Sequence, residues 1–292
     1  KNEKQSFRLD GSISIKSGCI KLPRNGKLKL AEKDYIPMNC KILSATVSRR
    51  AGKWFVSVQV ETLDGDPSIA NNEVVGIDLG IKTLATCSDG STYENPKALK
   101  KNLQRLKRRQ KQLSRKKKGS KNYEKVKQKL AKLHYHISNI RKDCLHKITS
   151  DIIQKNNVIV LEDLKVSNMM KNHHLAQAIS DVGLYEFRRQ IEYKAKWNGR
   201  KVIFSDTFFP SSQLCSCCGW KNSDLKLTNR IFECNICDVK IDRDLNASLN
   251  LKQIYTRGSL GIQACGDRSS SLSEMTLVSL SAKQEFNEKS IV

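Results

Sequence analysis

The stretch Val74-Val75-Gly76-Ile77-Asp78-Leu79-Gly80 decides the fold of this chain. Its apolar residues favour a buried β-strand, and the glycine at its end favours a turn. A second strand over 83–87 is expected to pair back with it, followed by a hairpin turn at 88–90 and a third strand near Tyr93. Because an aspartate inside an apolar strand is costly unless it is paired or bound to a metal ion, Asp78 is a candidate functional residue.

Further elements of the same sheet lie towards the C-terminus. Residues 157–161, Asn-Val-Ile-Val-Leu, form a short apolar run typical of a central strand. Residues 176–197 have helical periodicity that ends at Asn198-Gly199, and residues 201–204 favour another strand. A last helix is expected over 244–253. Together these elements predict an α/β fold with a mixed sheet.

The two ends of the chain differ from this central part. Residues 53–60 alternate between polar and apolar side chains, and glycines separate short runs, which predicts a small β-barrel-like domain over 1–72. The turn-rich segment 64–72 is expected to be a linker. Residues 256–292 are Ser-rich with little pattern and are expected to form a mobile tail.

Positive charge is concentrated in one segment. The chain has 292 residues, with 53 Lys and Arg against 29 Asp and Glu, and a net charge of +24. Apolar residues three and four apart, on both sides of a break at 116–120, predict an antiparallel helical hairpin over 97–150. Between Lys97 and Lys132, seventeen basic residues stand against one acid, Glu124. Such a surplus favours a polyanionic partner, most often nucleic acid, over a merely solvated surface.

The sequence does not favour a membrane protein. No apolar run approaches the roughly 18 residues that span a bilayer, and no signal peptide is visible. Binding to an anionic membrane surface would need a basic amphipathic helix with a bulky apolar face. The start at Lys1, without Met, is typical of a fragment or a processed product. We therefore expect a cytoplasmic location, with association to the nucleoid in a bacterium, and no ATP dependence, because no glycine-rich phosphate loop is present.

Two Cys-x-x-Cys turns, at 215–218 and 234–237, predict a zinc ribbon over 208–240. Facing each other, the turns supply four thiolates in a tetrahedron, which is typical of a closed structural zinc site. Cys217 could replace its neighbour, but the glycine after Cys218 suits the turn. The expected ligands are therefore Cys215, Cys218, Cys234 and Cys237. Four reduced structural thiols are the alternative.

Three acids occupy positions suited to metal-ion chemistry: Asp78 inside its strand, Glu162 directly after an apolar strand, and Asp244 at the start of the last helix. Carboxylate oxygens hold Mg²⁺ or Mn²⁺. Two such ions about 4 Å apart can activate water and stabilise the leaving oxygen of a phosphodiester. Each acid has a simpler explanation, since Asp78 could cap a turn, Glu162 could lie in a solvated loop and Asp244 could be a helix N-cap. Their strand–strand–helix order is that in which an RNase H-like sheet brings its acids together.

Several motifs between about 74 and 250 resemble the RuvC-like nuclease of transposon-encoded TnpB (OrfB) proteins, RNA-guided relatives of the type V CRISPR effectors. The matching motifs are Gly76–Gly80, Val160–Leu164, Ala178–Asp181, Gln190–Lys194, Pro210–Ser212, the two cysteine turns and Asp242–Ala247. Together, the Pro-Ser-Ser before the first turn and the Asp-Arg-Asp-x-Asn-Ala run after the second are a specific sign of this resemblance.

The resemblance implies an RNase H-like (RuvC) mixed sheet and a catalytic triad of Asp78, Glu162 and Asp244, which would bind Mg²⁺ or Mn²⁺, with Asp242 supporting the site rather than binding the metal. The implied domains are a wedge-type barrel at 1–72, the first part of the nuclease at 73–207 with the basic hairpin inserted at 97–150, the zinc ribbon at 208–240, the final nuclease helix at 241–255 and the tail at 256–292.

The resemblance also implies a guide RNA and a target DNA as partners. Arg230 falls where related nucleases place an arginine that positions the cut strand, and the ribbon is expected to help place that strand. The basic hairpin would bind the RNA–DNA heteroduplex through its phosphates, by shape rather than sequence. The expected contacts on the hairpin are Arg105, Lys107, Arg108, Arg109, Lys111 and Arg115.

The implied function is that of a transposon-associated RNA-guided DNA endonuclease. A remnant or repressor that binds nucleic acid without cutting is one alternative, but the presence of all three acids argues against it. A conventional transposase or junction resolvase is another, and it would need neither the basic hairpin nor an RNA. The family's N-terminal helical region and the start of its barrel are missing, and Asp238 stands where the family usually has glycine, so we expect target recognition to suffer before the nuclease core does.

Overall fold

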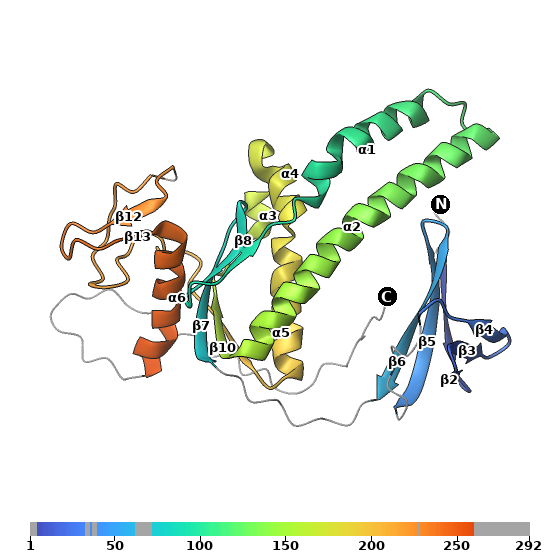
Figure 1. The fold of residues 1–292 in the computed structure, drawn as a ribbon, viewed down its shortest axis with the longest axis horizontal. Helices are drawn as coiled ribbons and strands as arrows, with labels where there is room; N and C mark the ends of the chain where they lie inside the picture. The colour runs from blue at the N-terminus through green and yellow to red at the C-terminus, as the bar shows by residue number, and fades with distance from the viewer. Residues whose placement is uncertain (1–4, 33–35, 37–39, 62–71, 227, 260–292) are drawn as a thin grey trace. The chain divides into compact units, whose positions relative to one another are not determined.

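The computed structural model describes residues 5–32, 36, 40–61, 72–226 and 228–259 (Figure 1). The chain divides into two compact units, one of Lys1–Asp66, Lys117–Tyr135 and Gly266–Val292, the other of Pro67–Lys116 and His136–Cys265. Nearly all of the predicted linker at 64–72 and of the predicted tail at 256–292 lies outside the described residues, so both stay predictions.

The N-terminal unit is rich in β-structure, as the alternating pattern predicted. One antiparallel sheet has the order β1–β5–β6, and a second has the order β2–β3–β4. Ile20, Leu22, Ala45 and Val58 form their buried core. The strands are β1 (Ser6–Asp10), β2 (Ser14–Lys16), β3 (Cys19–Leu22), β4 (Gly26–Lys29), β5 (Lys41–Arg50) and β6 (Lys53–Glu61). Closure of these strands into a barrel stays a prediction.

The larger unit is built on a five-stranded mixed sheet with the order β11–β10–β7–β8–β9. Strands β7, β10 and β11 are parallel, while β8 and β9 return antiparallel from β7. The strands are β7 (Asn72–Leu79), β8 (Thr83–Cys87), β9 (Thr92–Glu94), β10 (Asn156–Leu161) and β11 (Lys201–Phe204). The predicted α/β class with a mixed sheet is confirmed.

Six helices are described in addition to the strands. They are α1 (Ala98–Ser114), α2 (Lys121–Lys155), α3 (Val166–Met169), α4 (His173–Val182), α5 (Leu184–Trp197) and α6 (Arg243–Ser259). Within the described ranges, none of them is both long enough and apolar enough to cross a membrane.

The single helix predicted over 176–197 is wrong, because the structure has two helices there. Gly183 adopts a left-handed conformation with φ 77° and ends α4 before α5 begins. A Cβ at this position would lie 3.3 Å from the side chains of Arg141 and Leu145. The chain therefore turns at Gly183 in close contact with α2, and this requires glycine.

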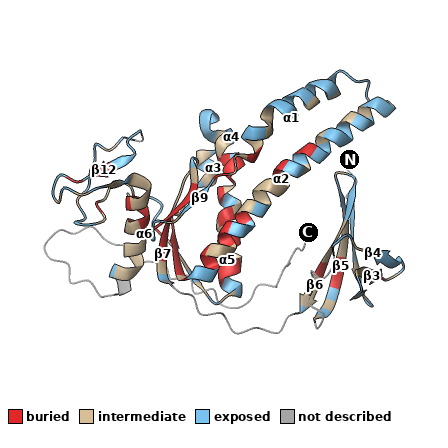
Figure 2. Ribbon diagram, viewed as in Figure 1, coloured by how far each residue is buried: buried red, intermediate tan, exposed pale blue. Residues whose placement is uncertain are grey.

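Residues of β7 and β10 alternate between the two faces of the sheet. Those that face the main core, formed with α2, α4 and α5, are Val75, Ile77, Ile159 and Leu161. Buried residues gather along β7 and on α2 and α5 (Figure 2). Because successive side chains point to opposite faces, Gly76, Asp78 and Glu162 face the other side. Helix α6 packs on β7 at that side.

Candidate metal centres and nucleic-acid surface

The strand register brings Asp78 and Glu162 together. Ile77 of β7 pairs with Leu161 of β10, so the next residue on each strand is an acid, and both acids belong to the face covered by α6. Loss of hydration, followed by the nearby negative charges of Glu162 and Asp244, raises the pKa of Asp78 well above its usual range. The three predicted acids therefore share one electrostatic environment at the carboxyl end of the parallel strands.

Gly76 allows α6 to pack directly on β7 and so brings the third acid to the site. A Cβ built on Gly76 would lie 2.1 Å from the carbonyl oxygen of Ser248 and 2.4 Å from the backbone nitrogen of Lys252. No side chain fits at this contact. Asp244 lies one turn before Ser248 on the same side of α6, so the close approach carries Asp244 towards Asp78.

Substitution of Gly76 by alanine is expected to push α6 away from β7. Overpacking of this kind costs roughly 1–3 kcal/mol, and here both clashing atoms belong to backbone, so we expect a clearly lower midpoint of thermal unfolding by circular dichroism. Gly119→Ala is the control, since a Cβ there meets nothing within 4 Å and only its positive φ of 81° opposes the change. Equal loss of stability in the two variants would contradict the proposed role of Gly76.

Asp242, rather than Asp244, caps helix α6. Its Oδ1 accepts the backbone N–H of Asp244 at 3.0 Å and that of Leu245 at 3.1 Å. Asp244 thus lies in the first helical turn, and its carboxylate does not cap the helix. That carboxylate lies 3.3 Å from Nη2 of Arg243 and 4.0 Å from Nη1 of Arg230. The arginine predicted to position the strand therefore reaches the same acid.

Glu162 and the next residue, Asp163, have different surroundings. The Ser211 hydroxyl donates a hydrogen bond to Oε1 of Glu162, and loss of hydration outweighs this bond and raises the pKa of Glu162. Asp163 instead accepts from Lys165, Arg188 and Thr207, and these donors lower its pKa to about 2. Asp163 is therefore an ionised structural residue paired with basic side chains, whereas Glu162 belongs to the acid cluster.

The acid cluster fits a hard divalent cation in its donor chemistry. Loss of hydration and the negative charges of Glu162 and Asp244 disfavour ionisation of Asp78, and a cation bound by carboxylate oxygens relieves such repulsion. Their oxygens do not all lie within 4.8 Å of one another. Among the described residues, only the four predicted cysteines reach that spacing.

Those cysteines, Cys215, Cys218, Cys234 and Cys237, form a compact cluster. Their sulfurs lie within 4.8 Å of one another, with 3.6 Å between Cys215 and Cys237 and 3.4 Å between Cys218 and Cys234. Cys217 is exposed and outside the cluster. Each turn closes with a residue of positive φ, Gly219 in the first and Asp238 in the second. Aspartate tolerates this conformation, which explains how Asp238 can stand in the place of glycine.

The remaining ribbon is small. Strands β12 (Ile231–Glu233) and β13 (Lys240–Asp242) pair antiparallel, and residues Leu214 and Lys221 form an isolated bridge. Phe232 is fully buried against Trp220, Leu225, Val239 and Ile241. So small an apolar core is typical of a unit that depends on its metal ion to fold.

Two buried asparagines of α6 connect the ribbon to the acid cluster. Asn246 donates to the Leu214 carbonyl at 2.6 Å and accepts the N–H of Ser216 at 2.9 Å. Asn250 donates to the carbonyls of Ser211 and Leu214, each at 2.7 Å. Helix α6 thus holds both the first cysteine turn and the serine that contacts Glu162. These roles of Asn246, Asn250 and Ser211 were missed from the sequence, although Ser211 and Asn246 lie in the quoted motifs.

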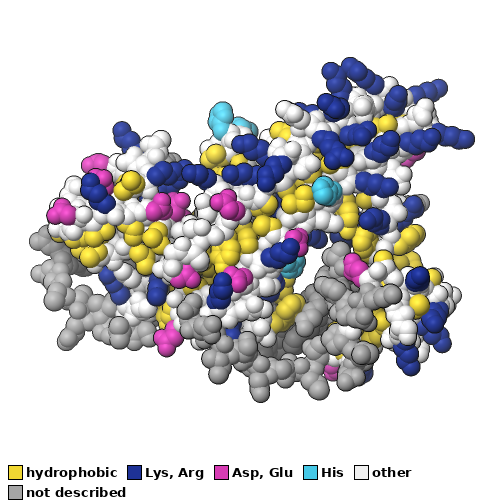
Figure 3. All heavy atoms as spheres, viewed as in Figure 1, with side chains coloured by type: hydrophobic (Ala, Val, Ile, Leu, Met, Phe, Trp, Pro, Cys, Tyr) yellow, Lys and Arg dark blue, Asp and Glu magenta, His cyan; other side chains and the backbone are white. Residues whose placement is uncertain are grey.

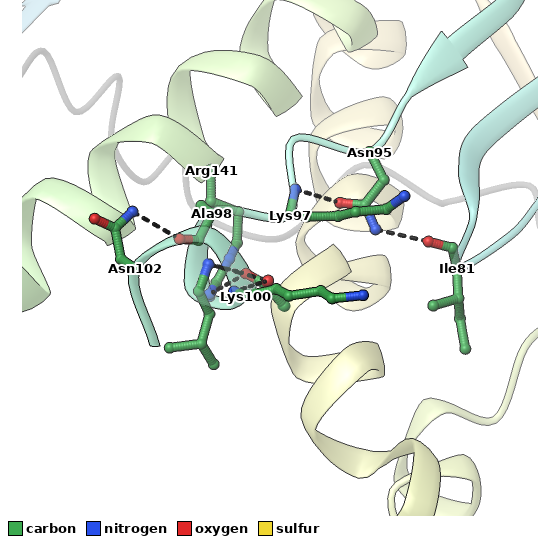
Figure 4. A network of polar contacts seen from close by, with 9 residues as sticks. Ile81, Asn95, Lys97, Ala98, Lys100, Asn102 and Arg141 are labelled. Carbon is green, nitrogen blue, oxygen red and sulfur yellow. Dashed lines mark hydrogen bonds and ion pairs between the residues drawn. The ribbon is translucent and has the colours of Figure 1, made fainter. Parts of the chain in front are cut away.

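A second polar network fixes the start of the basic helix α1. The backbone N–H groups of Leu99 and Lys100 donate to the Asp181 carboxylate at 2.8–3.0 Å, and Arg141 approaches it at 3.2 Å. Asn95 accepts from the N–H of Lys97 and donates to a carbonyl after β7 (Figure 4). Asp181 is almost fully buried and therefore joins α1, α2 and α4.

Replacement of Asp181 by alanine is expected to release the start of α1. The variant loses a helix cap and leaves Arg141 without this carboxylate, so we expect roughly 2 kcal/mol of lost stability. Hydrogen exchange of the α1 amides should become faster. Asp143→Ala is the matched control, because Asp143 forms an exposed pair with Lys147 that contributes little. Unchanged exchange in Asp181→Ala would contradict this role.

The predicted nucleic-acid contacts of the hairpin lie on α1, except Arg115, which directly follows its last residue. This helix contains no acidic residue, and Lys and Arg side chains gather along it (Figure 3). The exposed predicted contacts are Arg105, Lys107, Arg108, Lys111 and Arg115, while Arg109 is half-buried beside Gln112. The surface suits the phosphates of a nucleic acid.

Two family profiles match this sequence. The OrfB_IS605 family, described as "Probable transposase", matches residues 53–173. A profile described as "Cas12f1-like, TNB domain" matches residues 185–251, a range that includes the four clustered cysteines and Asp244.

Known proteins resemble much of the chain. A protein of Streptomyces pristinaespiralis named "Putative RNA-guided DNA endonuclease" is 40% identical over 254 residues, covering 84% of this chain and 62% of the relative. InsQ of Escherichia coli K12, which carries the same description, is 33% identical over 284 residues, covering 91% of this chain and 69% of InsQ. The chain thus spans about two thirds of the length of these relatives. The solved "Cas12f1-sgRNA-target DNA complex" contains a chain with a similar fold, at a TM-score of 0.52 and 20% identity, over 73% of this chain and 46% of that one.

Proposed function

Because this chain belongs to the OrfB_IS605 family of TnpB-type proteins, we propose that it is an RNA-guided DNA endonuclease whose cutting depends on a divalent metal ion. The resemblance identified from the sequence motifs is confirmed for the family. The observation that carries the activity is the meeting of Asp78, Glu162 and Asp244 on one face of the sheet. Both relatives described above are named as RNA-guided DNA endonucleases, which supports the same activity here.

The strand order of the five-stranded sheet supports this proposal. We assign residues 73–207 and 241–255 to an RNase H-like (RuvC) nuclease, with the basic hairpin inserted at 97–150. The zinc ribbon at 208–240 and a barrel-like domain at 1–72 complete the arrangement. Two acids at the ends of adjacent parallel strands and a third on a helix across the sheet are consistent with this assignment.

In the proposed site, Asp78, Glu162 and Asp244 would hold Mg²⁺ or Mn²⁺, which would supply an activated water and stabilise the leaving oxygen of the phosphodiester. Ser211 orients Glu162 through its hydrogen bond. Arg230 lies near Asp244, where its guanidinium can bind a phosphate of the DNA strand. The zinc held by Cys215, Cys218, Cys234 and Cys237 is structural, because all four of its positions are filled by thiolates.

The proposed partners are a guide RNA and a target DNA. Helix α1 presents a row of basic side chains without an acid among them, and the predicted contacts there, Arg109 included, suit a heteroduplex bound through its backbone. The Cas12f1 of similar fold was solved with an sgRNA and target DNA, which favours the same kind of partner for this chain.

Co-purified RNA provides the test of this function. The RNA that remains with the purified 292-residue chain is sequenced, and labelled single-stranded DNA complementary to its variable end is added with Mg²⁺ or Mn²⁺. We expect cutting that requires complementarity and stops with EDTA. Cutting of unrelated DNA at the same rate would favour a nuclease that needs no guide. Salt-sensitive binding of matched DNA without cutting would favour a binding remnant.

A further inference from the structure

We propose that Phe208 is a stacking site for an unpaired nucleobase of the DNA strand that enters the acid cluster. This inference rests on the proposed nuclease function and assigns to that site a residue that binds the base rather than the phosphate. It follows from the exposure of the ring, from the attachment of its loop and from the charges around it.

The Phe208 side chain is 93% exposed, the highest value among the large hydrophobic residues that the structure describes. A phenylalanine is normally buried, because its ring is large and has no polar group. Asp206 and Thr207 before it are exposed and polar, while Phe209 and Pro210 after it are half-buried. Phe208 is therefore the exposed ring of this loop, and it offers too little apolar area for a protein partner but enough for the face of one base.

The loop that carries Phe208 is ordered by hydrogen bonds. The backbone N–H of Phe209 donates to the Asp206 carbonyl at 3.1 Å, and that of Ser211 donates to the Phe209 carbonyl at 2.8 Å. The first of these turns contains Phe208 and the second follows it, so together they fix the path of the backbone. A backbone held in this way loses little conformational freedom when a base stacks on the ring.

Both sides of the loop are bound to the end of β10, where the acid cluster lies. On one side the Thr207 hydroxyl donates to Asp163 at 2.9 Å, and on the other the Ser211 hydroxyl donates to Glu162. Phe208 follows Thr207 directly and precedes Ser211 by three residues. At roughly 3.3–3.6 Å per residue, its Cα lies within about 11 Å of that of Ser211. This places the ring within a few nucleotides of the proposed metal centre.

Positive side chains lie around the acid cluster to which the loop is bound. Arg188 contacts Asp163 and stacks on Phe204 at 3.9 Å, while Arg230 and Arg243 lie beside Asp244. Arginines that attract phosphates, combined with an exposed ring that accepts any base, are the two elements of single-strand binding sites. Stacking on Phe208 would hold one nucleotide still, so that a nearby phosphate of the same strand remains at the acids.

The first test measures stacking without cutting. Single-stranded DNA with one 2-aminopurine, moved along the strand, is bound without added Mg²⁺ or Mn²⁺ to the wild-type chain and to Phe208→Ala, Phe208→Trp and Tyr185→Ala. Tyr185 is 68% exposed at the start of α5 and serves as the matched aromatic surface control. We expect quenching at one position that Phe208→Ala loses and the other two variants keep, with about tenfold weaker binding by Phe208→Ala in high salt. Quenching retained in Phe208→Ala at every position would overturn the inference.

The second test couples the ring to the reaction. An abasic nucleotide at the quenched position should slow cutting by the wild-type chain about tenfold, and should slow Phe208→Ala no further, because ring and base act as one pair. An equal abasic effect in both proteins would overturn the inference and leave the nuclease function intact. Position-specific quenching by a wild-type chain that does not cut would support the stacking site and contradict the nuclease function instead.

Discussion

Replacement of Asp78 by alanine is expected to abolish metal-dependent DNA cutting while the fold and nucleic-acid binding remain. Burial, followed by the negative charges of Glu162 and Asp244, raises the pKa of Asp78, so this carboxylate belongs to the same acid cluster as the other two. Loss of a group that acts as a unit with its neighbours reduces turnover by roughly 1,000-fold or more. Because the substitution removes one of several crowded like charges, we expect unfolding at an unchanged or slightly higher temperature.

The rate of cutting of labelled single-stranded DNA in Mn²⁺ measures this effect, and filter binding measures affinity. Asp206→Ala is the matched control, because Asp206 is an exposed acid in the loop that carries Ser211. It should cut at the wild-type rate. A wild-type rate in Asp78→Ala, or an equal loss in both variants, would show that the acid cluster is not the reactive centre.

Removal of a zinc ligand has the second largest expected effect. Cys234 is buried beside Cys218, and the ribbon core around Phe232 is too small to fold by itself. Structural zinc contributes about 10–16 kcal/mol to folding of comparable small motifs. We therefore expect Cys234→Ser to lose bound zinc and to expose the ribbon to protease, as measured by elemental mass spectrometry and limited proteolysis.

The effect should extend beyond the ribbon. Leu214 and Ser216 of the first cysteine turn are hydrogen-bonded to Asn246 on α6, so an unfolded ribbon releases the helix that carries Asp244. Cutting should be lost together with zinc. Cys217→Ser is the control, because Cys217 is exposed and outside the cluster. Zinc lost from Cys217→Ser but kept by Cys234→Ser would mean that the ligand set is wrong.

The sheet and its acids could be predicted because they depend on local pattern. The apolar runs before Asp78 and Glu162 specify two buried strands, and parallel pairing of adjacent strands places their ends at one edge. The cysteine spacing likewise specifies two facing turns. In both cases a short sequence carries the whole signal, so little depends on distant contacts.

Other features depend on distant contacts and could not be predicted. Gly183 looks like a tolerated glycine within a helix, and only its approach to Arg141 and Leu145 shows why the helix ends there. Asp242 and Asp244 satisfy the same rule for an N-cap, so the sequence could not assign the cap. The bonds of Asn246 and Asn250 join segments more than thirty residues apart, and no local pattern encodes such a pairing.

The location of the metal ion is the most direct test of the proposed centre. In the zinc-loaded chain, Fe²⁺ takes the place of Mg²⁺ in the acid cluster. Ascorbate with peroxide then generates radicals that cleave the backbone beside the bound iron. The fragments are mapped by mass spectrometry. We predict cleavage near residues 78, 162 and 244 together, lost in Asp78→Ala and suppressed by excess Mg²⁺. Cleavage at only one of the three segments, or a pattern that Asp78→Ala leaves unchanged, would contradict a metal centre shared by these acids.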